Sequence, residues 1–151
     1  MNDEKMLLGI KTGPMFSAFG RIMKTRIKQI GIPYTLEQLV MLKKISDTND
    51  TLVQQDIAEW MAKDKSVILR IVDVLEKDGL LTRRIDPQDR RRNILEITPN
   101  GEMVLGQLCD LENIVSNILL QDIPKDEVRI FFKVTDQIRQ NAERLGSELS
   151  K

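Results

Sequence analysis

The sequence contains no histidine and only one cysteine, and both absences exclude classes of function. Without histidine there is no imidazole to act as a general base, to ligate a metal or to change charge near neutral pH. The single cysteine, Cys109, cannot form an internal disulfide or a CxxC pair, which suits a reducing compartment. No pair of acidic residues and no nucleophile–base pair stands out. The sequence therefore predicts a protein that is not an enzyme and has neither a metal site nor a cofactor.

Long apolar runs and a net charge are also missing. The 23 basic and 23 acidic residues cancel, and no apolar run approaches the roughly 20 residues that span a bilayer. The N-terminus has no apolar core of the kind found in secretory signals. We therefore expect a globular protein of the cytoplasm with no membrane partner. The charge is unevenly placed, because residues 1–92 hold 17 basic and 13 acidic side chains, against 6 and 10 in residues 93–151.

Apolar residues recur at helical spacing over most of the chain. Thr12-Gly13-Pro14 is typical of a helix start, and Gly31-Ile32-Pro33 of a helix end. Thr35 with Gln38 three residues later is a capping-box pattern that opens a second helix. Further helices are predicted over about 52–61 and 64–78, then from Pro99 and from Pro124.

The helix predicted over 64–78 has one apolar and one polar side. Its apolar side is formed by Ile68, Ile71, Val72 and Leu75. Its polar side is formed by Ser66, Arg70, Asp73 and Lys77. Asp64 suits the N-cap position, and Gly79 suits a residue with positive φ just after the helix.

From Leu80 the apolar period changes from helical to alternating. LLTRRI and NILEIT are short β-prone runs, and DPQDRRR between them carries a proline turn and no apolar residue. A short helix, a turn, a polar-faced helix and a hairpin form the winged helix-turn-helix arrangement. Such a fold places the second helix in the DNA major groove and an arginine-bearing wing in the minor groove. We predict a mainly α fold with a small β-hairpin wing at 86–92.

The same segments are similar to a known family. Residues 57–102 resemble the MarR family of bacterial winged-helix transcription regulators. The family's hallmark, Asp-x-Arg in the wing followed by an apolar strand and Thr-x-x-Gly, stands here at Asp89 to Arg91, 94–97 and Thr98 to Gly101. The resemblance implies a DNA-binding lobe at 35–98 between helical dimerisation regions at 8–31 and 99–150.

The resemblance implies a homodimer on a pseudo-palindromic site in double-stranded DNA, with a repressor as the expected role. Arg91 matches the arginine that the family inserts into the minor groove, Asp89 its orienting partner, and Arg70 the arginine of the recognition helix. The full DNA-binding set that we expect is Lys63, Lys65, Ser66, Val67, Arg70, Val74, Asp89, Arg90, Arg91 and Arg92.

One position departs from the family pattern. Many members carry a second arginine one turn after Arg70, where this chain has Val74. Valine cannot pair with phosphate or guanine, but it can contact a thymine methyl group. Val74 therefore either favours an A/T-biased half-site, or it packs against the wing or touches nothing, and the sequence leaves these alternatives open.

Family regulators commonly respond to a small aromatic or lipophilic effector. Phe16, Phe19 and Met23 on the first helix are candidates to line such a site, although the same residues suit a plain core or dimer interface. Trp60 is equally ambiguous. Cys109 lies far from the first helix, where oxidant-sensing members carry their reactive cysteine, so it is interpreted as a packing or surface residue. The alternative function is a winged-helix module that docks on proteins and has no sequence-specific DNA binding.

Overall fold

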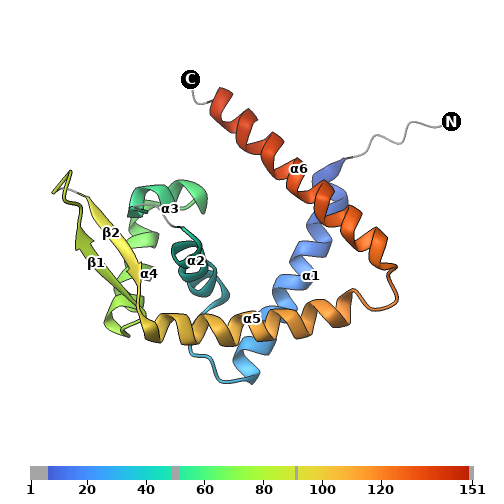
Figure 1. The fold of residues 1–151 in the computed structure, drawn as a ribbon, viewed down its shortest axis with the longest axis horizontal. Helices are drawn as coiled ribbons and strands as arrows, with labels where there is room; N and C mark the ends of the chain where they lie inside the picture. The colour runs from blue at the N-terminus through green and yellow to red at the C-terminus, as the bar shows by residue number, and fades with distance from the viewer. Residues whose placement is uncertain (1–6, 49–51, 91, 150–151) are drawn as a thin grey trace. The chain divides into compact units, whose positions relative to one another are not determined.

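The protein is described by a computed structural model that covers residues 7–48, 52–90 and 92–149. Its elements follow the chain as shown in Figure 1: α1 (Leu8–Gln29), α2 (Leu36–Asp47), α3 (Gln54–Trp60), α4 (Lys65–Lys77), β1 (Leu81–Ile85), β2 (Asn93–Ile97), α5 (Pro99–Leu119) and α6 (Lys125–Leu149). Helices dominate, with one two-stranded antiparallel sheet. The predicted fold class is therefore confirmed.

The described residues divide into two compact units, one ending at Asn113 and one beginning at Ile114. The first unit holds α1 to α4, the hairpin and most of α5, and the second holds the end of α5 and α6. The first unit thus includes more than residues 35–98. Met23 and Ile27 of α1, and Leu105 and Leu108 of α5, are buried together with the residues of the lobe.

The first helix begins earlier than the sequence predicts. It starts at Leu8, so Pro14 lies inside it instead of at its first turn. A capping interpretation requires the Thr12 hydroxyl to accept a hydrogen bond, but this hydroxyl donates to the Leu8 carbonyl at 2.9 Å. Threonine makes this bond within helices. The start predicted at Thr12-Gly13-Pro14 is therefore wrong.

The second helix begins as predicted. The Thr35 hydroxyl accepts from the Gln38 amide at 3.2 Å, and the Gln38 side chain accepts from the Thr35 amide at 2.8 Å. Both partners of the capping box are thus present. The helix ends at Asp47, and residues 49–51 after it lie outside the described part of the chain.

The turn between α3 and α4 contains a non-glycine residue with left-handed backbone, Ala62 at φ 49°. The Lys63 and Ala62 amides donate back to the Ala58 and Glu59 carbonyls at 3.0 and 3.1 Å, which closes the end of α3. Holding alanine in this conformation costs about 1–2 kcal/mol, so the turn depends on these hydrogen bonds and on the packing of both helices.

The amphipathic character of α4 is confirmed. All four predicted apolar residues are buried, and all four predicted polar residues are exposed. Gly79 follows the helix at φ 71°, and the Leu80 amide donates to the Leu75 carbonyl at 2.8 Å. Asp64 occupies the N-cap position, as predicted. Its backbone carbonyl accepts from the Val67 and Ile68 amides, while its side chain makes no cap hydrogen bond.

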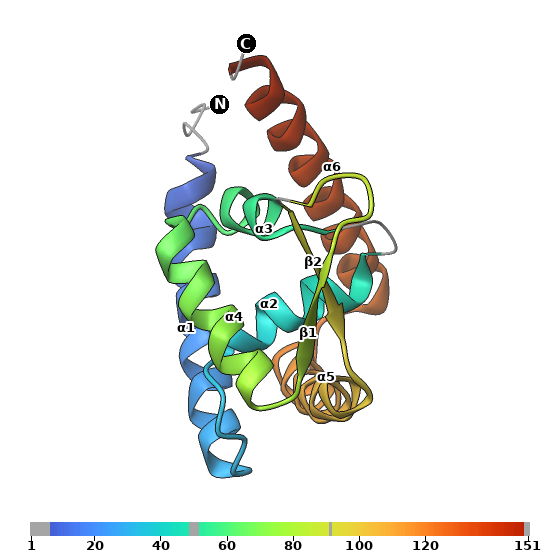
Figure 2. The ribbon, with the colours of Figure 1, turned by 90° about the vertical axis from the view of Figure 1, so that its left-hand side faces the viewer.

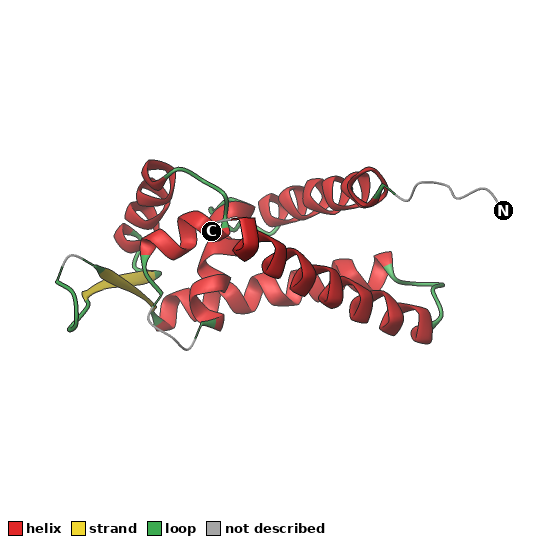
Figure 3. Cartoon of the chain, turned by 90° about the horizontal axis from the view of Figure 1, so that it is seen from above, coloured by secondary structure: helices red, strands yellow, loops and turns green. Residues whose placement is uncertain are grey.

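The hairpin is antiparallel, with Leu81 opposite Ile97 and Ile85 opposite Asn93. A further bridge links Val53 to Ile94 and ties the hairpin to the segment before α3. Figure 3 shows the loop of the hairpin projecting beyond the helices of its unit. The bridge involves the second residue of β2, so the segment before α3 holds the hairpin near the end of the strands that leads into the loop.

Two contacts join segments of the first unit that are far apart in the sequence. The Tyr34 hydroxyl, between α1 and α2, interacts with the Asp78 carboxylate at the end of α4. Burial and this neighbouring carboxylate raise the pKa of the Tyr34 hydroxyl. The Ser46 hydroxyl donates to the Glu102 carboxylate at 2.9 Å, which links α2 to α5. In the described part of the chain, no helix has both the length and the apolar character to cross a bilayer.

Candidate nucleic-acid interface

The polar side of α4 and the hairpin lie next to each other in the first unit. Figure 2 views the lobe from this side, with α4 and β1 adjacent. The side chains of Lys65, Ser66 and Arg70 are exposed along the first half of α4. Neither Lys65 nor Arg70 forms an ion pair with another described residue. Their charges are therefore available to an anionic partner.

Lys63 is placed differently from the other predicted cations. Its ammonium lies 2.8 Å from the Glu37 carboxylate of α2, and both side chains are about two-fifths exposed. Lys63 also borders a shallow depression of about 470 Å³ over the turn between α3 and α4. Seven further residues line that depression: Gln55, Ala58, Glu59, Ala62, Asp64, Lys65 and Val67.

The wing tip is organised by Asp86, a charged residue that is only 8% exposed. Its carboxylate accepts from the Gln88 amide at 2.8 Å, and its amide donates to the Arg92 carbonyl at 3.0 Å. The Arg92 amide in turn donates to the Asp89 carbonyl at 2.9 Å. These bonds give the loop a defined backbone, and sequence analysis had not assigned Asp86 any role.

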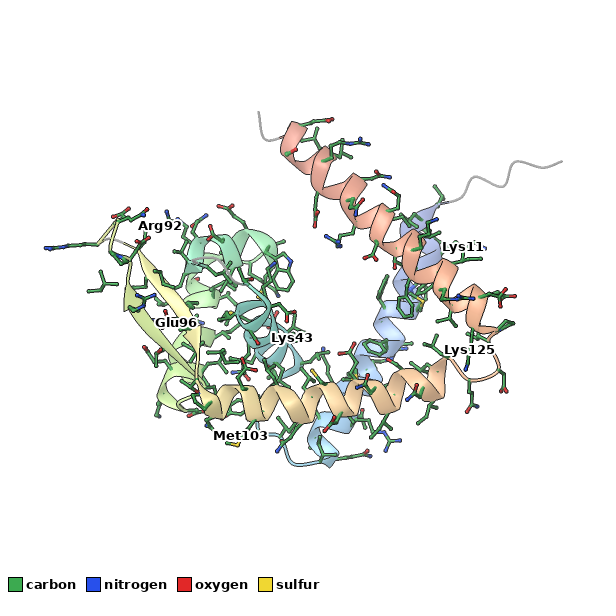
Figure 4. The ribbon with its side chains drawn as sticks, viewed as in Figure 1. Lys11, Lys43, Arg92, Glu96, Met103 and Lys125 are labelled. Atoms are coloured by element: carbon green, nitrogen blue, oxygen red, sulfur yellow. The ribbon has the colours of Figure 1, made fainter. Side chains whose placement is uncertain are left out.

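Arg90 and Arg92 project from this loop with exposed side chains. Figure 4 labels Arg92 at the tip of the hairpin, with Glu96 further down β2. Neither arginine forms an ion pair with another described residue. Arg91, the predicted minor-groove residue, lies outside the described residues.

Arg83 of β1 connects the hairpin to α4, and the sequence patterns did not indicate it. Its guanidinium pairs with the Asp73 carboxylate and lies 3.0 Å from the Glu76 carboxylate. Its backbone amide also donates to Glu76 at 3.2 Å, while its Nε atom is buried with no hydrogen-bond partner. Strand alternation could have indicated this residue, since position 83 shares a face with the buried Leu81.

Arg84 points to the opposite face of the same strand. It pairs with Glu96 of β2 at 2.7 Å, and both side chains are about half exposed. This pair lies wholly within the hairpin. Adjacent arginines in the sequence therefore make two different connections, one from the hairpin to α4 and one within the hairpin.

Val67 and Val74 flank the polar side of α4. Val67 is partly buried, whereas Val74 is 41% exposed. Val74 is therefore not packed away beneath the wing. Its isopropyl group is accessible one turn beyond Arg70.

The candidate effector residues are not equivalent. Met23 is 1% exposed and belongs to the core, Phe19 is partly buried, and Phe16 is 60% exposed. Trp60 is half exposed, with the Lys44 ammonium 5.3 Å from its ring centre. Cys109 is a free, partly buried thiol on α5.

Comparison with known proteins identifies the arrangement. A family model described as the MarR family matches residues 34–92. A crystal structure of MarR is 26% identical, with a TM-score of 0.81 over 98% of each chain. The regulator BldR from Sulfolobus solfataricus is 25% identical, with a TM-score of 0.72 over 89% of this chain and 96% of its own.

A curated relative agrees over a shorter stretch. It is a proposed transcriptional regulatory protein for the hcr operon of Thauera aromatica, 40% identical over 68 residues. This stretch is 45% of the present chain, which spans only 40% of the relative. The family model covers the winged lobe, and the likeness in structure covers nearly the whole chain, so the chain is similar to the MarR family of transcriptional regulators in the sequence of its lobe and in its fold.

Proposed function

We propose that the protein is a sequence-specific DNA-binding transcriptional regulator that acts as a homodimer on a pseudo-palindromic site, as a repressor in the cytoplasm. Recognition helix α4 enters the major groove and the wing enters the minor groove. The observation that carries this proposal is a set of exposed cations on one lobe that form no ion pair with another described residue, Lys65 and Arg70 on α4 and Arg90 and Arg92 on the wing.

The placement of these cations supports DNA over other anionic partners. The exposed side of α4 is a straight polar surface with Ser66 and Arg70 near its N-terminal half, which is the part of a recognition helix that contacts base edges. The wing adds arginines on a projecting loop, and guanidinium groups favour the narrow, strongly negative minor groove. Two such elements side by side fit two neighbouring grooves of one duplex.

The homodimer is supported by α6. This 25-residue helix has no buried residue, although it carries a repeating apolar side. Phe131, Leu145 and Leu149 on that side are at least 41% exposed. A second copy of the chain would cover this surface and would place a second recognition helix for the other half of a palindrome.

An effector site remains part of the proposal at the first helix. Phe16 and Phe19 provide aromatic surface that is at least partly accessible, and a small aromatic or lipophilic molecule is the expected ligand class. Met23 would contribute only from within the core.

The test is fluorescence anisotropy of the purified chain on the duplex upstream of its own gene, with a scrambled duplex of equal length as control, over a range of salt concentrations. We expect tight, selective binding in which log K falls linearly with log salt, at a slope of about −0.9 per phosphate neutralised. Equal, weak binding to both duplexes would contradict a specific site there. No binding at low salt would support the protein-docking alternative.

A further inference from the structure

The DNA-facing side of α4 contains one acidic residue, and its charge needs an explanation. Asp73 lies three residues after Arg70 and four before Lys77, so all three share one side of the helix. The Asp73 side chain is 52% exposed. An uncompensated carboxylate in this position would repel the phosphates that the neighbouring cations attract.

The positive charge that compensates the Asp73 carboxylate comes from Arg83 of β1, and not from another residue of α4. It reaches Asp73 and Glu76 together, with two guanidinium nitrogens and its backbone amide. The Arg83 side chain is only 21% exposed, and it lies on the face of β1 that packs on α4. Held in this way, the guanidinium has little surface left for a DNA phosphate.

We propose that Arg83 is a positioning residue for DNA recognition: it cancels the Asp73 charge on the DNA-facing side of α4 and fixes the angle between the wing and this helix. The proposal rests on the DNA-binding function proposed above. It separates Arg83 from the other cations of the lobe, because Arg83 acts through Asp73 and Glu76 and makes no DNA contact.

The geometry requires arginine. The planar guanidinium presents several N–H donors in a fixed fork and so spans two carboxylates at once, whereas a lysine ammonium is a single point charge on a flexible stem. Substitution by lysine would preserve the net charge while losing one of the two carboxylate contacts. Arg83→Lys thus separates a positioning role from a simple charge effect.

Arg84 provides a matched control. Arg83→Gln and Arg84→Gln remove the same charge from neighbouring positions of one strand, but only Arg83 is tied to α4. Any general weakening of DNA attraction would affect both variants alike. Only a positioning role would separate them.

The experiment compares wild type, Arg83→Gln, Arg83→Lys and Arg84→Gln as full-length chains on the same duplex by fluorescence anisotropy. We expect Arg83→Gln to weaken specific binding roughly tenfold or more, the scale of one lost groove contact. Arg83→Lys should lose most of that affinity too. Arg84→Gln should lose no more than about threefold, as for an exposed pair.

Rescue tests the charge component. Replacing Asp73 by asparagine in the Arg83→Gln chain removes the uncompensated carboxylate. DNA affinity should then recover in part, although the contact between the hairpin and α4 through Arg83 is still missing. Equal losses in Arg83→Gln and Arg84→Gln, or full affinity in Arg83→Lys, would overturn the proposal. The first result would indicate a charge effect and the second a direct phosphate contact.

Amide hydrogen exchange of the hairpin distinguishes failure of this proposal from failure of the proposed function. Exchange over residues 81–97 should rise in Arg83→Gln and not in Arg84→Gln, with or without DNA. If wild type binds no duplex, the proposed function fails, and with it the DNA role of Arg83. If wild type binds and the hairpin exchanges equally in both variants, only the positioning role fails. Should Arg83→Gln not fold, Arg83→Lys carries the same comparison.

Discussion

At the scale of single residues, Val74 distinguishes this recognition helix from the family pattern. Its side chain is 41% exposed and stands one turn beyond Arg70 on the accessible part of α4. An accessible valine offers no hydrogen bond but can contact the methyl group that marks thymine in the major groove. The alternative, in which Val74 is covered by the wing, does not fit this exposure.

A thymine contact can be tested by removing the methyl group from the DNA. Once a bound duplex is known, each thymine of a half-site is replaced by deoxyuridine. We expect one replacement to weaken wild-type binding roughly fourfold, equivalent to about 0.8 kcal/mol for one buried carbon group. Val74→Ala should bind both duplexes equally. A wild-type protein that is indifferent to every replacement would remove Val74 from base recognition.

The residues that sequence patterns predicted are those fixed by local structure. The buried side of α4 follows from helical periodicity, and the positive φ of Gly79 follows from its place after a helix. Ala62 has the same conformation, yet alanine carries no such preference, so packing of the two helices must impose it. The link from Arg83 to Asp73 could not be predicted in the same way, because it requires the angle at which the hairpin meets α4.

At the scale of elements, the hairpin and α5 meet in a tight junction. The Thr98 amide donates to the Leu80 carbonyl at 3.0 Å, and the Thr98 hydroxyl donates to the Gly79 carbonyl at 2.6 Å. A Cβ atom on Gly101 would lie 2.2 Å from that Leu80 oxygen and 2.6 Å from a side-chain carbon of Ile97. The Thr-x-x-Gly motif therefore has a structural reason, since its glycine lets α5 begin against the end of α4.

We predict that Gly101→Ala destabilises the protein by about 1–3 kcal/mol, the usual cost of forcing extra atoms into a packed site. Gly106→Ala is the matched control, because it lies inside the same helix with nothing within 4 Å of the added carbon. It should stabilise the protein by about 0.5–1 kcal/mol through helix propensity. Thermal unfolding followed by circular dichroism measures both changes. Equal changes in melting temperature in the two variants would show that the atoms around Gly101 move to accommodate the added methyl group, and would contradict the prediction.

The start of α2 could be predicted from its side-chain cap, whereas the start of α1 could not. Thr35 and Gln38 marked the start of α2 correctly, because their side chains make both cap hydrogen bonds. Nothing of this kind marks the start of α1, where Leu7 precedes the helix with no side-chain cap. The Thr12-Gly13-Pro14 pattern predicted a helix start at the wrong place, because Pro14 lies inside α1 instead of in its first turn.

At the scale of the whole molecule, the uneven charge of the sequence is explained by the proposed division of roles. The exposed cations of α4 and the wing, which form no ion pair within the described part of the chain, belong to the first unit. The second unit carries exposed apolar residues, among them the edge-to-face pair Phe131 and Phe132 with ring centres 5.5 Å apart. A neutral total thus combines a surface suited to phosphate with one suited to a second copy of the chain.

If α6 forms the dimer, one charge on its apolar side should separate the subunits. Phe131→Glu places a carboxylate in both copies of the interface and removes a ring whose burial contributes about 1.5–3 kcal/mol per copy, so the dimer should weaken by roughly hundredfold or more. Gln140→Glu adds the same charge on the opposite side of the helix, nine residues after Phe131, and should leave the dimer intact. Sedimentation velocity over a dilution series measures both variants.

The same two variants connect the dimer to DNA recognition. Because each subunit would present one recognition helix, the monomeric Phe131→Glu chain should contact a single half-site and lose its preference for the palindrome, while Gln140→Glu keeps it. A dimer that persists in Phe131→Glu would place the subunit contact elsewhere in the chain. A monomer that still binds the palindrome as tightly as wild type would show that a single lobe is sufficient for recognition, and the coupling of α6 to DNA binding would be wrong.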